Sequence, residues 1–190
     1  MKKLLIYLFL ILFYPSISFA NSISEYEVGG LRLGKSLLDV ITEDEIKENM
    51  IPTTSGADKF VTTLYIANIF TYPDLDFGLY AVTFKVNDKK YKIHGFYAIE
   101  LFENDFKGCL KKQDQLTKEL AKKFGIKPYD WGIDEKPSTG KGKWRAVIFD
   151  FPIPSDTASV LCYHFEDEPE RDNLKLGILT REYADFITVK

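Results

Sequence analysis

The sequence predicts an α+β protein in which an antiparallel β-sheet carries one long helix and short helices packed on one face. Segments rich in β-branched and aromatic residues follow one another through short turns, which is typical of antiparallel strands. An amphipathic helical segment, residues 105–124, interrupts them, and its apolar stripe includes Cys109. Asn104 or Asp105 can cap its start, and Gly125 can end it. Of the two cysteines, Cys109 lies on this helix and Cys162 on a late strand, so a disulfide can clip the helix to the sheet.

The N-terminus has the composition of a secretory signal peptide. Two lysines precede an unbroken apolar run, residues 4–14, and small residues at the −3 and −1 positions indicate cleavage after Ala20. The alternative is a membrane anchor, but this run makes only about 16 Å of helix, whereas the hydrocarbon core of a bilayer is ~30 Å thick. We therefore expect residues 1–20 to be removed and residues 21–190 to form a single α+β domain, periplasmic or secreted.

The charge of the chain restricts its partners. It has 25 basic and 28 acidic residues and a formal net charge of −3, and the signal peptide takes away two of the lysines. Such a chain is unsuited to nucleic acid, which requires basic patches, and to an anionic membrane surface. No segment after the signal peptide is long and apolar enough to span a bilayer. The expected partner is therefore an unknown protein or a small-molecule ligand, and no motif indicates a cofactor.

Cys109 and Cys162 are expected to form a structural disulfide. An exported protein meets oxidising conditions, and the two cysteines form an even pair. The competing interpretation, a redox or nucleophilic cysteine, lacks the C-x-x-C spacing of thiol oxidoreductases. A bridge that closes a loop of about 50 residues is worth ~4 kcal/mol in the chain-entropy model.

The first elements are predicted from capping signals. Residues 26–33 form a short strand, and Ser36 caps a helical turn over residues 37–41. Thr42 and Glu45 then have the spacing of a capping box, so residues 43–50 are predicted to be a helix that ends before a proline.

The same stretch matches the nucleotide-binding pattern G-x-x-x-x-G-K-[ST] literally, from Gly29 to Ser36. Its interior alternates as a strand does instead of being rich in glycine, and the helix after it is only one or two turns long. We therefore interpret it as a corner between a strand and a helix.

The remaining elements follow from periodicity and turn residues. Asn87 and Asp88 are predicted to form the tight turn of a β-hairpin. Residues 126–143 have prolines, glycines and no period, and are predicted to be a long loop. Thr180 caps a short C-terminal helix. The strands are predicted at residues 60–70, 79–86, 89–102, 144–151, 158–165 and 174–180.

The candidate ligand site lies at this long loop. Tryptophans and a tyrosine bracket the glycine- and lysine-rich stretch of residues 138–144, which could bind an anion through backbone N–H groups or remain a solvated loop. An aromatic-walled groove here is the best place for a ligand or a peptide. The predicted ligand-binding residues are Tyr129, Trp131, Lys141, Lys143 and Trp144.

The two histidines give the chemical alternatives. If His94 and His164 align, they could bind a metal with Glu166 or Asp167, but neither has a metal-ligand spacing. The chain has no G-x-S-x-G nucleophile elbow. The acidic stretch of residues 166–172 lacks the alternating frame of a calcium loop. We therefore assign no metal ligand and no catalytic residue, and the histidines serve only the alternative of a small envelope hydrolase.

The pattern G-x-x-x-G-x-S-x-x-x-V, formed by Gly30, Gly34, Ser36 and Val40, resembles the early motif of small exported bacterial envelope proteins of the SmpA/OmlA type. That resemblance implies a motif that turns into the first helix of a small α+β domain. This chain differs from those outer-membrane assembly lipoproteins because it lacks a lipoprotein cysteine, is much longer and does not gather its helices at the N-terminus. No binding residue is transferred.

Three functions are consistent with these features. The first is a non-enzymatic envelope protein that binds a ligand or a partner, because the chain has no catalytic constellation. The second is the small hydrolase that uses His94 or His164. The third is an assembly or inhibitory module that binds a protein partner through a face of its sheet.

Overall fold

The computed structural model describes residues 23–51, 59–66, 71–72, 75–134, 141–152 and 156–188, with the backbone alone at residues 65–66, 71–72 and 75–76. The predicted signal peptide and its cleavage site lie outside the described residues. None of the helices within these ranges has the length and hydrophobicity needed to cross a bilayer.

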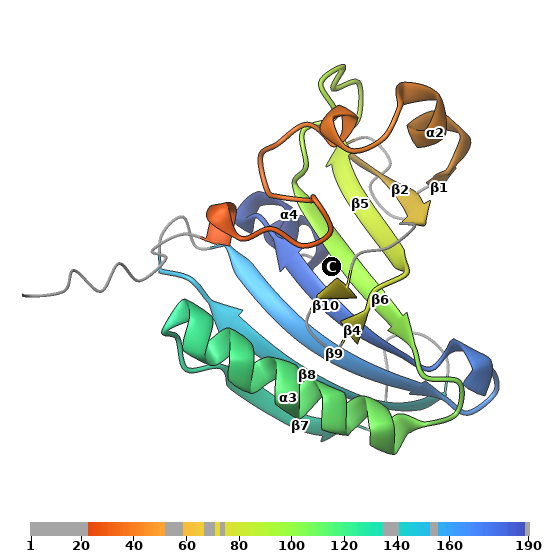
Figure 1. Ribbon diagram of the computed structural model, residues 1–190, viewed down its shortest axis with the longest axis vertical. Helices are drawn as coiled ribbons and strands as arrows, with labels where there is room; N and C mark the ends of the chain where they lie inside the picture. Colours follow the sequence, from red (N-terminus) through yellow and green to blue (C-terminus); the bar gives the residue numbers. More distant parts are fainter. Residues whose placement is uncertain are drawn as a thin grey trace, which may run out of the picture.

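The described strands form an eight-stranded antiparallel sheet in the order β1-β2-β5-β6-β10-β9-β8-β7 and a separate ribbon, β3-β4 (Figure 1). Each half of the large sheet is a run of neighbouring strands, and the halves meet where β6 pairs with β10. The strands are β1 (Met50–Ile51), β2 (Phe60–Ile66), β3 (Thr71–Tyr72), β4 (Leu75–Asp76), β5 (Leu79–Lys85), β6 (Gly95–Leu101), β7 (Tyr129–Asp134), β8 (Gly142–Asp150), β9 (Thr157–Phe165) and β10 (Asn173–Leu179).

The long helix α3 (Phe106–Phe124) carries the chain from β6, at the centre of the sheet, to β7 at its edge. Its N-cap Asp105 accepts a hydrogen bond from the Gly108 N–H, and Gly125 ends it, as the sequence predicts. The other helical segments are η1 (Ile23–Glu25), η2 (Leu37–Asp39), α2 (Glu43–Glu48), η3 (Pro169–Arg171) and α4 (Arg181–Thr188).

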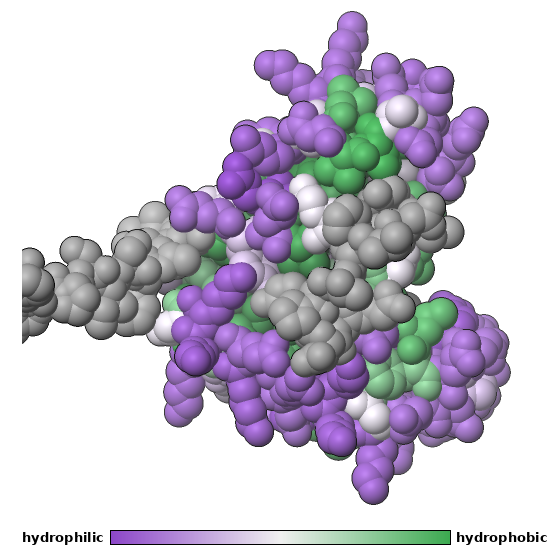
Figure 2. All heavy atoms as spheres, in the orientation of Figure 1, coloured by the Kyte–Doolittle hydropathy of each residue, from purple (hydrophilic) through white to green (hydrophobic). Residues whose placement is uncertain are grey.

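The helix α3 and the N-terminal segment cover one face of the large sheet, which we call the core face. In Figure 1, α3 crosses in front of β8 and β9, and the N-terminal segment crosses in front of β5 and β6. Alternate strand residues point into this core, among them Val82, Phe96, Val160, Leu176 and Ile178. Hydrophilic residues form most of the outer surface on this side, and hydrophobic residues show near α2 (Figure 2).

The other face, which we call the open face, carries the intervening residues of the same strands. The register of the strands places these residues on the open face, where they line two hollows. They include Ala81, Tyr97, Ile99, Trp144, Ala146, Ile148, Ser159, Leu161, Tyr163 and Lys175.

The disulfide predicted from the sequence is present. Cys109 on α3 is bonded to Cys162 on β9, with 6.0 Å between their Cα atoms and a sequence separation of 53. Both cysteines are fully buried. The α+β class and the clip between the long helix and the sheet are therefore confirmed.

The C-terminal helix differs in position from the other helices. Its cap is as predicted, since the Thr180 hydroxyl accepts a hydrogen bond from the Tyr183 N–H. However, α4 packs against the open face, where it shares a hollow with Tyr97 and Tyr163 of the sheet. The rings of Tyr183 and Phe186 hold it there by packing at 5.1 and 5.0 Å from the ring of Phe60.

The N-terminal caps are confirmed, whereas the strand predicted at residues 26–33 is wrong. Ser36 caps η2, and Thr42 forms a complete capping box with Glu45. In place of a strand, Val28 and Leu31 exchange backbone hydrogen bonds across the two-residue turn Gly29–Gly30, both at positive φ. The stretch that matches a nucleotide motif in sequence thus begins as a tight turn.

The predicted two-residue turn between β5 and β6 is also wrong, although the two strands do pair. The connection spans residues 86–94. The Asp88 carboxylate accepts hydrogen bonds from the N–H groups of Lys90 and Lys92. The Gly34 N–H donates to the Ile93 carbonyl. The connection is longer because it also binds the N-terminal segment. The turn residues Asn87 and Asp88 do not indicate this contact.

Candidate functional site

The predicted loop over residues 126–143 is wrong in its first part, because residues 129–134 form the edge strand β7. This strand pairs with β8 through a bulge between Asp130 and Ile133. Arg145 on β8 fixes its position with ion pairs of 2.6 Å to Asp130 and 2.7 Å to Asp114 on α3. The guanidinium group of Arg145 lowers the pKa of Asp130 through their hydrogen bond. The middle of the predicted loop, residues 135–140, lies outside the described residues.

The edge strand carries two exposed aromatic side chains to the border of the open face. Tyr129 and Trp131 are 63% and 61% exposed, and their ring centroids lie 5.9 Å apart at nearly a right angle. Both line a hollow of about 690 Å³ between the sheet and α4. Trp144 on β8 lines it as well, so the structure brings together the three aromatic residues that the sequence predicts as a ligand site.

Two rings on the floor of this hollow, those of Trp144 and Tyr163, belong to a row of parallel rings. Trp144 stacks beside Tyr163 with centroids 6.1 Å apart, and Tyr163 stacks beside Phe165 at 6.0 Å. The Trp144 indole N–H is buried and has no hydrogen-bond partner among the described residues. A buried donor without an acceptor costs roughly 1–3 kcal/mol.

A second hollow of about 250 Å³ adjoins the first and shares Tyr97, Leu161 and Tyr163 with it. Lys175 on β10 lines it, with its Nζ atom 4.9 Å from the centroid of the Tyr163 ring. Burial raises the pKa of Tyr97 and that of Tyr163. Both phenols therefore stay neutral in the physiological range and can donate hydrogen bonds.

The two lysines of the predicted site lie apart from this hollow. Lys143 pairs with His164 in the strand register, so its side chain belongs to the face opposite Trp144. Lys141 is exposed at the end of the strand, where its carbonyl accepts a hydrogen bond from the Glu166 N–H. The glycine-rich stretch is thus partly built into the β8–β9 ladder, which does not favour an anion-binding loop.

The two histidines lie at opposite ends of the sheet and do not converge. His94 precedes Gly95 at the start of β6, whereas His164 follows Tyr163 near the far end, where β10 begins. Within the described ranges, no group of three His, Cys, Asp or Glu side chains could hold a metal ion.

His164 lies 2.7 Å, through Nδ1, from the Oδ2 atom of the fully buried Asp172. Asp172 also accepts a hydrogen bond from the Phe165 N–H. A histidine oriented by an aspartate is part of a catalytic triad. However, in the part of the chain that the structure describes, no hydroxyl or thiol is hydrogen-bonded to His164. The pair therefore joins the end of β9 to the start of β10.

His94 should make stability depend on pH. Its pKa is lowered by burial and by the Lys85 and Lys92 ammonium groups, against the carboxylates of Glu182 and Asp88. The unfolded histidine, with a pKa near 6.5, therefore binds more protons than the folded one. We expect the free energy of unfolding to be highest above about pH 6.5 and to fall as the pH is lowered toward 5, above the range in which carboxylates titrate.

Urea unfolding at pH 7.5, 6.5 and 5.5 measures this dependence. His94→Gln should flatten it by up to one proton, and His164→Gln is the matched comparison. An equal pH dependence in the wild type and His94→Gln would contradict this assignment.

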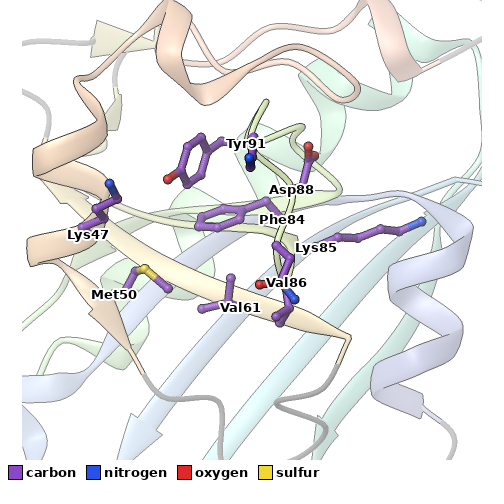
Figure 3. Close-up of a pocket in the computed structure, with 10 residues that line it drawn as sticks. Lys47, Met50, Val61, Phe84, Lys85, Val86, Asp88 and Tyr91 are labelled. Carbon is purple, nitrogen blue, oxygen red and sulfur yellow. The ribbon is translucent and has the colours of Figure 1, made fainter.

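A third hollow, of about 490 Å³, lies between α2 and the β5–β6 connection (Figure 3). Met50, Val61, Phe84 and Tyr91 surround it. Part of its polar rim is already paired: Lys47 binds Glu43 at 2.7 Å, the Tyr91 hydroxyl donates to Glu43, and Lys85 binds Glu182 at 2.9 Å.

No protein-family model, curated protein or solved structure matches the chain. The candidate site therefore rests on its geometry. The open-face residues that sequence reasoning missed are Tyr97, Leu161, Tyr163 and Lys175. They belong to β6, β9 and β10. Their only sequence signal is the alternation of side chains, which shows that residues share one side of a strand but not which strands lie beside it.

Proposed function

We propose that this chain is an exported, non-enzymatic protein of the bacterial envelope that binds a partner protein through the open face of its sheet. The observation that carries the proposal is the aromatic hollow that Tyr129, Trp131 and Trp144 line together with α4. Tyrosine and tryptophan are enriched in protein interfaces because they bury a large area and still have a polar atom.

Export is supported by the N-terminal composition and by the buried disulfide. Disulfides persist in oxidising compartments and are rare in the reducing cytosol. The periplasm, or release from the cell, is therefore the compartment that we propose. The early motif that resembles SmpA/OmlA-type proteins is consistent with an envelope location, although a hairpin turn and two capped turns account for its residues.

Partner binding is favoured over hydrolysis because, among the described residues, no hydroxyl group that lines the hollows is hydrogen-bonded to a histidine side chain. The hydrolase alternative would need His94 or His164, and neither lines the hollows of the open face among the described residues. The alternative stays a prediction whose sole structural support is the His164–Asp172 pair.

Affinity capture tests the proposal. Residues 21–190, immobilised, are expected to capture one stoichiometric protein from an envelope extract of the source bacterium. The double variant Tyr129→Ser, Trp131→Ser should weaken capture at least about tenfold, because two exposed aromatic anchors are removed without opening the core.

Leu38→Ser is the matched control, since Leu38 is also an exposed hydrophobic residue but lies on η2, away from the open face. It should capture the same protein as the wild type. Capture that is equal for the wild type and both variants would place the interface elsewhere. No stoichiometric capture by the wild type would contradict the proposal itself.

A further inference from the structure

Lys175 is an unusual residue for the middle of a sheet. It lies on β10, where the register places it between Ile99 of β6 and Leu161 of β9. All three line the smaller hollow of the open face. The ammonium group forms no ion pair or hydrogen bond with any residue that the structure describes, and it lies over the Tyr163 ring.

The environment of Lys175 disfavours its charge. Burial lowers the pKa of the ammonium group, and the nearby guanidinium group of Arg171 lowers it further. A partly buried cation without a carboxylate costs free energy, so an apolar side chain would fill this position at lower cost. A charge retained in such a place, inside a hollow, is a candidate for binding an anionic group.

The rest of the open face indicates the size of the bound molecule. The two hollows share three residues, and together they extend over β5, β6, β10, β9, β8 and β7. Six neighbouring strands span about 24 Å at the usual spacing of about 4.8 Å. Small molecules are mostly enclosed within one cleft. A surface this wide, with exposed aromatic residues at its border, suits a polypeptide segment.

The larger hollow supplies complementary features. Its stacked rings of Trp144 and Tyr163 form an apolar floor. The Tyr163 ring lies between Trp144 and Lys175. A carboxylate at Lys175 and an aromatic or apolar residue beside it can therefore be bound at the same time.

We propose that the partner presents a segment in which an aspartate or glutamate, flanked by aromatic or apolar residues, binds Lys175 while its neighbours pack on Trp144 and Tyr163. This inference rests on the proposed function and specifies its partner. The carboxylate supplies the missing counter-ion, and its neighbours supply apolar surface.

Titration of the ¹⁵N-labelled domain, residues 21–190, with short peptides tests the inference by NMR. The probe is the pentapeptide Gly-Phe-Asp-Phe-Gly with both ends blocked, and the matched probe has asparagine in place of aspartate. We expect shifts in β8, β9 and β10 and at least about fivefold weaker binding of the asparagine peptide. Lys175→Met should remove this difference, Lys175→Arg should keep it, and Lys118→Met, on the exposed side of α3, should not alter it.

The outcomes distinguish the role of Lys175 from the binding function of the open face. Equal binding of the two peptides on the open face would overturn the role of Lys175 and leave the proposed function standing. Shifts that avoid the open face with every probe would count against both. Sodium phenylacetate is a third probe. If it bound as tightly as the aspartate peptide, the site would be one for small carboxylates and the polypeptide partner would be wrong.

Discussion

Replacing both cysteines with alanine is expected to lower the free energy of unfolding by about 4 kcal/mol. The bridge between Cys109 and Cys162 closes a loop of 53 residues, and the chain-entropy model gives this value for a loop of that length. The loop contains α3 residues after Cys109, all of β7 and β8, and most of β9. Without the bridge, the unfolded chain has a higher conformational entropy, and this lowers the free energy of unfolding.

Alanine is the suitable replacement because both positions are fully buried, and serine would add a buried hydroxyl group. Urea unfolding followed by circular dichroism measures the change, with and without a thiol reductant. The reductant should destabilise the wild type and have no effect on the double variant. A wild-type midpoint that is the same in both conditions would show that the bridge contributes little to stability.

Gly142→Ala is expected to destabilise the domain by about 3 kcal/mol. Gly142 has φ +149°, and a Cβ atom there would lie 1.9 Å from the backbone carbonyl oxygen of His164. The obstacle is backbone in the neighbouring strand, so the β8–β9 ladder must shift to make room. Backbone strain of this kind is among the few causes of large effects from a single substitution.

Gly132→Ala separates the clash from the effect of backbone conformation. Gly132 lies in β7 at φ +73°, where an added Cβ atom meets nothing within 4 Å. Its substitution should cost about 1 kcal/mol, the usual penalty for a left-handed alanine. Thermal unfolding of the two variants gives the comparison. If Gly132→Ala were as destabilising as Gly142→Ala, contact with His164 would not be the cause.

Local signals predicted where the helices begin. The cap residues Ser36, Thr42, Asp105 and Thr180 all act as the sequence indicates, because a cap binds backbone groups within a few residues of itself. The apolar stripe of α3 likewise identified Cys109 as a core residue. These features need no knowledge of distant parts of the chain.

Features that depend on distant residues could not be predicted. The strand β7 contains Gly132 at positive φ and a bulge, which break the alternation that marks a strand. Its position depends on the ion pairs of Arg145 with Asp130 and Asp114, which are 15 and 31 residues away. The N-terminal segment similarly determines the length of the β5–β6 connection.

The residues of the candidate site could likewise be predicted only where they lie close together in the sequence. Tyr129, Trp131 and Trp144 could be grouped because they lie close in sequence, and the structure brings them to one hollow. Lys143 was grouped with them for the same reason, but neighbouring residues of a strand point to opposite faces. Lys175 could not be identified, since its significance depends on the register of β6, β9 and β10.

The open face is the surface to which we propose that a partner binds. Photo-crosslinking tests it most directly, with a benzophenone amino acid in place of Trp131 on the open face or of Lys118 on α3, in the full chain expressed in its source bacterium. Irradiation should join one envelope protein to position 131 and none to position 118. An adduct at position 118 with none at position 131 would contradict the claim.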